Sequence, residues 1–286
     1  MINRNLKIAI LMTIFSLFLI TPVLASDENN DNLVFPFLNL ENATEEMIDD
    51  YLIKMGFEKK EIEVMSTQLK ADIAKKGGKK VELSKTSSEV VTYDQFGRKM
   101  DYNSSLSSTP SVFNSSSSSS SDIFSLWAYV SKNEDESNSS ENSYSVWVYY
   151  KWSESPFNFY TDKLAVAWQS KAGPYGDPSG FGNTQLVLDC CEHPPESWDL
   201  PVDKQELEGT SWKVDVKAGG PDVEQWGQGY MEIRVPTKYE GTTGALEVGY
   251  AHRLGPGSIT VTLNYGDVSF TPVLTEVYED RYNFTY

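Results

Sequence analysis

The spacing of apolar residues divides the chain into four parts. Residues 8–20 form a nearly continuous apolar run, and residues 42–78 place apolar side chains three or four positions apart. Residues 79–121 show no apolar period, whereas the period is two from there to the end. The longer period is typical of amphipathic helices and the shorter one of half-buried strands. The sequence therefore predicts a mainly β protein, with an antiparallel β-sandwich over residues 122–286 after a small two-helix segment.

The predicted sandwich consists of short alternating stretches that Gly, Pro, Asn and Asp residues separate. These stretches span residues 126–130, 144–152, 163–169, 184–189, 211–217, 230–235, 245–252, 257–265 and 268–273. Many short strands joined by turn residues favour an antiparallel sandwich. We expect a hairpin around residues 254–257, followed by a strand that turns Ile259, Val261 and Leu263 toward the core.

Residues 42–78 predict an amphipathic helical hairpin. Asn42 or Thr44 is the candidate N-cap of its first helix, and Gly56 is the candidate C-cap. A second helix is expected over residues 59–76, because two lysines and two glycines mark its end. We interpret this unit as a pro-segment or a docking arm that covers part of the following domain.

Residues 79–121 are predicted to be a flexible linker. They are rich in serine, with an uninterrupted run from Ser115 to Ser121. A stretch with no apolar period buries too little surface to offset the entropy of ordering. One short strand over residues 90–93 is expected ahead of the serine run.

The first 25 residues have the pattern of a secretory signal peptide. Arg4 and Lys7 precede the apolar run, and small residues lead to an expected cleavage after Ala25. The run is shorter than the roughly 20 residues that a membrane span needs, although an uncleaved anchor is an alternative. We therefore expect a secreted or cell-envelope protein with no integral membrane span after cleavage.

An exported chain exposes Asn-X-Ser/Thr triplets to glycosylation. Such triplets begin at Asn42, Asn103, Asn114, Asn138 and Asn283. All five are candidate acceptors, but a chain rich in Ser and Asn also produces such triplets by composition alone.

Acidic residues dominate the charge. The chain has 41 Asp and Glu against 24 Lys and Arg, which gives a formal net charge of −17. This balance argues against nucleic acid or anionic lipid as a partner, because both require clustered basic side chains.

The neighbours Cys190 and Cys191, with His193 close behind, form the one unusual cluster of reactive residue types. Thiols and imidazole are ligands for zinc or copper, but structural zinc sites usually place two or more residues between paired ligands. A strained disulfide between the two neighbours, free or buried thiols, and a bridge to a second chain are the alternatives.

No cofactor is predicted. Two polar loops, residues 132–143 and 171–182, contain acidic or glycine-rich stretches whose spacing does not match a calcium loop. Loosely bound calcium remains an alternative to a solvated hairpin tip.

The sequence gives little support for a catalytic motif, so the catalytic residues are unknown. The serine of residues 176–180 is one position off the Gly-x-Ser-x-Gly pattern. Any triad would have to recruit His193 or His252, the two histidines of the sequence. We expect His252 to be a core or rim histidine with satisfied hydrogen bonds.

Three aromatic residues are candidates for stacking against a ligand. Trp127, Trp147 and Tyr149 alternate with the aliphatic residues of two predicted strands and therefore lie on the opposite face. Aromatic rings that face outward can stack on sugar rings.

Three stretches of the C-terminal part, residues 146–152, 161–168 and 249–259, resemble segments of uncharacterised exported β-rich proteins of bacteria and archaea. The resemblance covers about 150 residues. It implies export and β architecture, and it implies no activity.

These features favour a non-catalytic module that binds a glycan or an envelope protein. One alternative is an extracellular hydrolase kept latent by the helical segment. A second is a membrane-perturbing, antagonistic protein whose Ser- and Thr-rich hairpins insert after assembly. Oligomeric state stays open.

Overall fold

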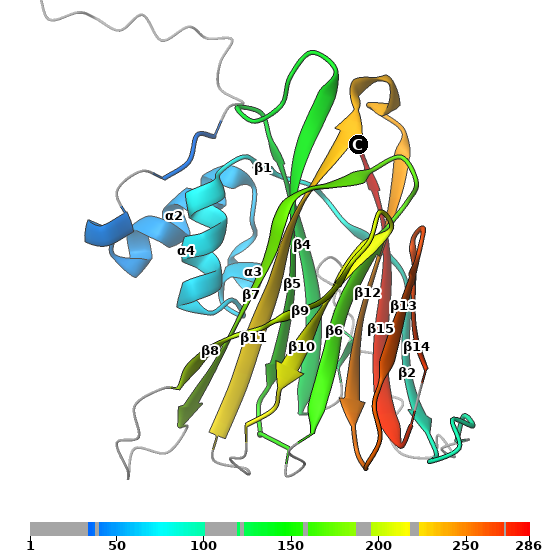
Figure 1. Cartoon of the computed structure of the whole chain (residues 1–286). Helices are drawn as coiled ribbons and strands as arrows, with labels where there is room; N and C mark the ends of the chain where they lie inside the picture. Colours follow the sequence, from blue (N-terminus) through cyan, green and yellow to red (C-terminus); the bar gives the residue numbers. More distant parts are fainter. Residues whose placement is uncertain are drawn as a thin grey trace, which may run out of the picture. The chain divides into compact units, whose positions relative to one another are not determined.

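The computed structural model describes a mainly β protein whose antiparallel sheets pack in a sandwich-like arrangement, with short helices near the N-terminus (Figure 1). The described residues are 34–37, 40–100, 119–120, 123–156, 160–186, 196–217, 223–271 and 273–286. The predicted fold class is confirmed.

The first sheet has seven strands within these ranges, in the order β1-β4-β5-β11-β7-β8, with β3 also pairing with β4. Its strands are β1 (Lys79–Lys80), β3 (Ser119–Ser120), β4 (Phe124–Asn133), β5 (Glu141–Trp152), β7 (Gly173–Leu186), β8 (Ser197–Asp199) and β11 (Val223–Pro236). The centre of the sheet is therefore formed by β5 and β11, two long strands that pair along most of their length.

The second sheet has six strands in the described part, in the order β2-β15-β12-β6-β10-β9. These are β2 (Ser84–Tyr93), β6 (Thr161–Trp168), β9 (Val202–Gln205), β10 (Gly209–Asp215), β12 (Thr243–Arg253) and β15 (Thr275–Thr285). The short 3-10 helix η2 (Thr237–Tyr239) connects β11 to β12, so the chain crosses from one sheet to the other there.

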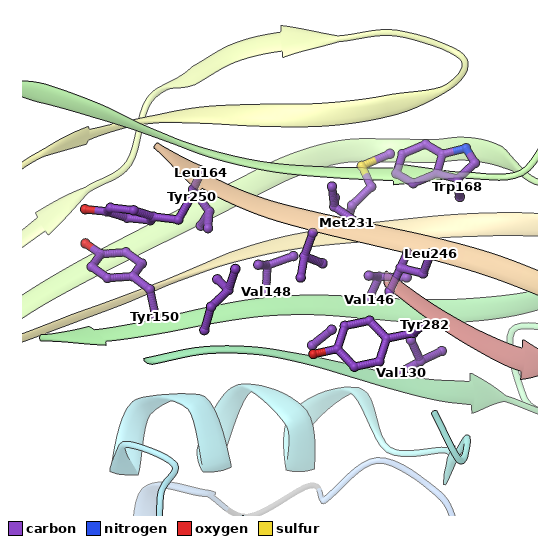
Figure 2. Close-up of a cluster of buried hydrophobic side chains, with 14 of the residues drawn as sticks. Val130, Val146, Val148, Tyr150, Leu164, Trp168, Met231, Leu246, Tyr250 and Tyr282 are labelled. Carbon is purple, nitrogen blue, oxygen red and sulfur yellow. The ribbon is translucent and has the colours of Figure 1, made fainter. Parts of the chain in front are cut away.

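The main core lies between the two sheets. Alternate residues of β5, among them Val146 and Val148, contact inward-facing residues of the second sheet such as Leu246 and Tyr250. Figure 2 shows side chains from both sheets in this one cluster. Since successive side chains of a strand point to opposite faces, the other half of each strand faces outward.

A third small sheet covers the outer face of the second sheet. Its strands β13 (Thr260–Asn264) and β14 (Asp267–Thr271) pair with each other across a turn at Gly266. Val261 and Leu263 are buried as predicted, and the Phe270 ring approaches Gly249 so closely that a Cβ there would lie 2.7 Å from it.

The hairpin predicted around residues 254–257 is wrong. The strand before that turn, β12, pairs with β6 and β15, and the strand after it, β13, pairs with β14. The turn instead carries the chain from the sandwich to the outer hairpin, a change of layer that the alternation of a strand does not encode.

The helical segment contains η1 (Leu40–Asn42), α2 (Glu45–Met55), α3 (Lys59–Ile62) and α4 (Thr67–Lys76). Thr44 caps α2, and Gly56 ends it in the left-handed conformation with φ 101°. The single helix predicted over residues 59–76 is wrong, because the chain breaks between α3 and α4 and begins again at Ser66, whose side chain accepts from the Leu69 amide.

The linker predicted over residues 79–121 is also wrong for its described part, although the short strand expected over residues 90–93 is present as the end of β2. Strand β2 pairs with β15 along its length, and β1 pairs with β4. Residues 34–286 form one compact unit. The helical segment and the sandwich are consequently not separate domains.

Candidate functional site

The outer face of the first sheet is aromatic at its centre, and the helical segment covers it. Trp127 and Tyr129 from β4, with Trp147 and Tyr149 from β5, form one buried cluster with apolar residues of the helices, including Leu69 of α4. Figure 1 shows the helices beside this sheet.

The three stacking candidates are therefore not exposed. Trp127 is 8% exposed, Tyr149 1% and Trp147 fully buried. Sequence alternation placed them correctly on the outer face, but their role as exposed ligand platforms is wrong, because the helices occupy that surface.

The same aromatic face continues beyond the helices. The Tyr149 ring lies 6.3 Å from that of Trp226 on β11, and the Trp226 ring lies 5.8 Å from that of Phe181 on β7. On the neighbouring row, Trp147 lies 5.4 Å from Tyr230. Trp226, Phe181 and Tyr230 are partly exposed, so the aromatic row emerges where the helical cover ends.

A groove of about 260 Å³ lies at this point. Residues of α4 line one side, and residues of β7 and β11 line the other. The pairing of β11 with β7 sets Gln228 opposite Phe181 and Tyr230 opposite Ser179. Because directly opposed residues of an antiparallel pair share a face, these four side chains lie together on the outer face.

Asp72 of α4 and Gln228 of β11 join the two sides of the groove. The Gln228 amide nitrogen donates to Asp72, and Gln68 donates to the other carboxylate oxygen at 2.9 Å. Burial raises the pKa of Asp72, while both of these hydrogen bonds act to lower it. The pair fixes the position of the carboxylate and orients the Gln228 amide.

The amide oxygen of Gln228 is a second feature of the groove. Gln228 is 3% exposed, and its Oε1 has no hydrogen-bond partner among the described residues. A buried acceptor without a donor costs about 1–3 kcal/mol, so its presence in a groove requires an explanation.

Two lysines complete the groove. The Lys76 ammonium lies 5.2 Å from the centre of the Tyr230 ring, 3.8 Å from Glu136 and 3.9 Å from Glu232. Lys75 is exposed and forms no ion pair within the part of the chain that the structure describes. Lys76 therefore holds the end of α4 against the sheet, whereas Lys75 leaves a donor at the rim.

A buried polar network supports the floor beside the groove. Ser143 donates to Glu232 at 2.9 Å, and Arg234 lies 2.9 Å from the same carboxylate. The Tyr230 hydroxyl lies 3.4 Å from Ser145. Ser145 and Lys76 are therefore the polar side chains in contact with Tyr230, and the Glu232 network lies beside it.

The other residues singled out by the sequence lie elsewhere. Cys190, Cys191 and His193 are outside the described residues. His252 is 3% exposed, and its Nδ1 lies 2.7 Å from Asp162, which also accepts from the Tyr250 hydroxyl at 2.7 Å. His252 is thus a buried histidine with a hydrogen-bond partner, as predicted.

The candidate glycan acceptors occupy different surroundings. Asn42 and Asn138 are exposed, and the Asn138 side chain accepts from the backbone at the tip of the β4–β5 hairpin. Asn283 is half-buried in β15 between two neighbouring strands. Asn103 and Asn114 are outside the described residues.

Of the two polar loops predicted from the sequence, the structure confirms one and contradicts the other. Residues 134–140 form the tip of the β4–β5 hairpin, where Glu134 lies 3.5 Å from Lys132. Most of residues 171–182 belong to β7, so the second predicted loop is wrong. Within the described ranges, no three His, Cys, Asp or Glu side chains are arranged to hold a metal ion, and no helix is long and apolar enough to span a membrane.

Sequence reasoning identified Trp147, which lines the groove, but it missed Asp72, Phe181, Gln228 and Tyr230. The alternation of Trp226, Gln228 and Tyr230 along β11 could have placed these three on one face. The position of α4 beside them depends on tertiary packing, for which the sequence contains no local signal.

Comparison with known proteins adds little. No protein-family model matches the chain, and no curated protein matches it. Among solved structures, the chain is similar to the crystal structure of the Clostridium perfringens NetB toxin in its membrane-inserted form, with 9% identity and a TM-score of 0.30 over 70% of this chain and 97% of that one. A likeness at this TM-score carries no argument about fold or function.

Proposed function

We propose that the protein is an exported, non-catalytic binding module that holds a sugar ring in the groove between α4 and strands β7 and β11. The observation that carries the proposal is the meeting of partly exposed rings, Phe181 and Tyr230, with the fixed polar pair of Asp72 and Gln228. Export rests on the signal-peptide pattern of residues 1–25.

The chemistry of the groove suits a saccharide. A sugar has an apolar ring face that packs on an aromatic side chain and a rim of hydroxyls that hydrogen-bond to polar side chains. Small-molecule sites combine apolar walls with a few fixed polar groups in this way. The volume of about 260 Å³ is just below the roughly 300 Å³ at which drug-sized ligand sites begin, so the groove suits one ring rather than a long chain.

Binding is favoured over hydrolysis by the acidic groups of the groove. Among the described residues that line it, Asp72 is the single carboxylate. Glycoside hydrolysis requires two carboxyl groups that flank the bond to be cut. One carboxylate held by two amides can position a hydroxyl, but it does not supply the second group.

The test is a titration of the full exported chain with a panel of monosaccharides and disaccharides, followed by calorimetry or by NMR shifts. We expect at least one member of the panel to bind, and Phe181→Ala to weaken that binding about 10-fold, in line with the loss of one ring contact.

Tyr265→Ala is the matched control, because Tyr265 is an exposed aromatic residue on the distant β13–β14 turn. It should leave the affinity unchanged. Absence of binding by every saccharide, or equal losses in the two variants, would refute the proposal.

A further inference from the structure

We infer that the sugar held in the groove carries an N-acetyl group, which the Gln228 amide oxygen and Lys75 recognise together. This inference rests on the proposed function and names its ligand class. It starts from two groups on opposite sides of one groove, an unpaired buried acceptor on β11 and an exposed donor on α4.

The acceptor has a fixed orientation. The amide nitrogen of Gln228 donates to Asp72, so the oxygen of the same planar amide is turned away from that carboxylate. Gln228 is almost wholly buried, and no described group donates to its oxygen. A ligand N–H that reaches this oxygen would remove the cost of an unpaired buried acceptor.

The donor lies on the facing helix. Lys75 lines the groove and forms no ion pair within the described ranges, whereas its neighbour Lys76 is held by Glu136 and Glu232. An ammonium group can donate three hydrogen bonds and accepts none. Lys75 lowers the pKa of Asp72 by its charge, and its exposed ammonium group can donate to a ligand carbonyl oxygen at the rim.

An amide group matches this pair. It presents an N–H and a C=O on opposite edges, which is the complement of an acceptor facing a donor. An acetamido group also has a methyl, and the side chains of Phe181, Tyr230 and Trp147 give the groove apolar walls. A plain hydroxyl could donate to Gln228, but it would use neither the apolar wall nor the second contact.

The test compares N-acetylglucosamine with glucose on the full chain. These ligands share a ring and differ at one substituent. We expect N-acetylglucosamine to bind on the order of 10-fold more tightly, because a site built around a hydrogen bond discriminates against the analogue that lacks it.

Two variants locate the effect. Gln228→Met removes the acceptor and keeps the length of the side chain, and it should abolish the preference for N-acetylglucosamine. Lys75 lies on the surface, so Lys75→Met should fold normally. It should reduce the preference for N-acetylglucosamine severalfold. Gln185→Met, an exposed residue on the outer face of β7, is the control and should retain the full preference.

The outcomes separate the two proposals. Equal affinity for both ligands, or a preference that survives in Gln228→Met and Lys75→Met, overturns the N-acetyl assignment while the saccharide-binding function stands. If neither these ligands nor any other saccharide binds, the proposed function fails and the assignment fails with it. If Gln228→Met does not fold, the N-acetyl assignment is tested by Lys75→Met alone. A preference for N-acetylglucosamine that is unchanged in Lys75→Met then overturns the assignment.

Discussion

The pKa of Glu279 depends on the neighbouring side chains in the sheet. It lies partly buried on the outer face of β15. Its pKa is raised to about 7, first by burial and then by the carboxylates of Glu247, Glu89 and Asp267, against the opposing effect of Arg281. In the unfolded chain the same group would ionise near its ordinary value of about 4.3.

We therefore expect Glu279 to make the protein less stable as the pH rises from about 4.5 to 7. Over this range the folded state keeps a proton that the unfolded state has released, so stability falls with pH. Glu279→Gln cannot ionise. It should match the natural protein near pH 4.5 and exceed its free energy of unfolding by roughly 1 to 2 kcal/mol at pH 8, after allowance for solvent screening.

Urea unfolding at the two pH values measures this difference. Glu46→Gln, at an exposed position of α2, serves as the control and should show no such dependence on pH. A gain for Glu279→Gln that is equal at both pH values would show that packing, and not ionisation, is responsible.

At the scale of elements, α4 has two roles. Leu69 and Ile73 bury one face of the helix against the aromatic residues of the first sheet, and Asp72 and Lys75 on another face line the groove. The helix begins at Ser66, whose hydroxyl accepts from the Leu69 amide at 3.1 Å and also bonds to the buried Tyr149 hydroxyl. The start of the helix is thus tied to the sheet.

Ser66→Ala should lower the free energy of unfolding by about 1 to 2 kcal/mol, because it removes an N-cap and the partner of Tyr149. Ser66→Thr keeps a hydroxyl and should lose much less. Chemical denaturation of both variants gives the comparison, and a similar loss in the two would mean that the side-chain volume matters more than the cap.

Sequence patterns predicted elements well where one face is apolar and one polar. The alternation in β5, β6 and β12 located these strands within a few residues, and Gly56 marked the end of α2. They predicted only the last residues of β2 and β7, namely residues 90–93 and 184–186, because β2 begins as an exposed, Ser-rich edge strand and β7 begins with a Gly- and Pro-rich stretch. Strand β15, which alternates clearly between Val277 and Phe284, was missed although its pattern was readable.

The same limit applies to the groove. Phe181 and Gln228 come together through the register of β7 on β11, and Asp72 reaches them from a helix more than a hundred residues earlier. Local alternation can assign a residue to a face, but it does not reveal what packs against that face. The stacking candidates Trp127 and Tyr149 lie buried under the helices for this reason, whereas Trp147 is buried but also lines the groove.

On the scale of the whole molecule, both outer faces of the sandwich are covered in part by other segments of the chain. The helical segment covers the first sheet, and the β13–β14 hairpin covers the second. The segment from α2 to β2 also supplies strands to both sheets, with β1 on β4 and β2 on β15. An arm built into the sheets in this way cannot leave without breaking their hydrogen bonds.

This arrangement predicts the result of cutting the chain once. A protease site placed between Met100 and Ser119 should yield a fragment that contains α2–α4, β1 and β2. We expect it to stay bound to the remainder under native conditions, because the buried cluster around Leu69 and the pairing of β2 with β15 do not depend on the cut bond. Size-exclusion chromatography should show one species that separates only in denaturant, and tryptophan fluorescence should not change. A latent hydrolase released by cleavage would need the opposite result, with the fragment eluting alone and Trp127 and Trp147 becoming exposed.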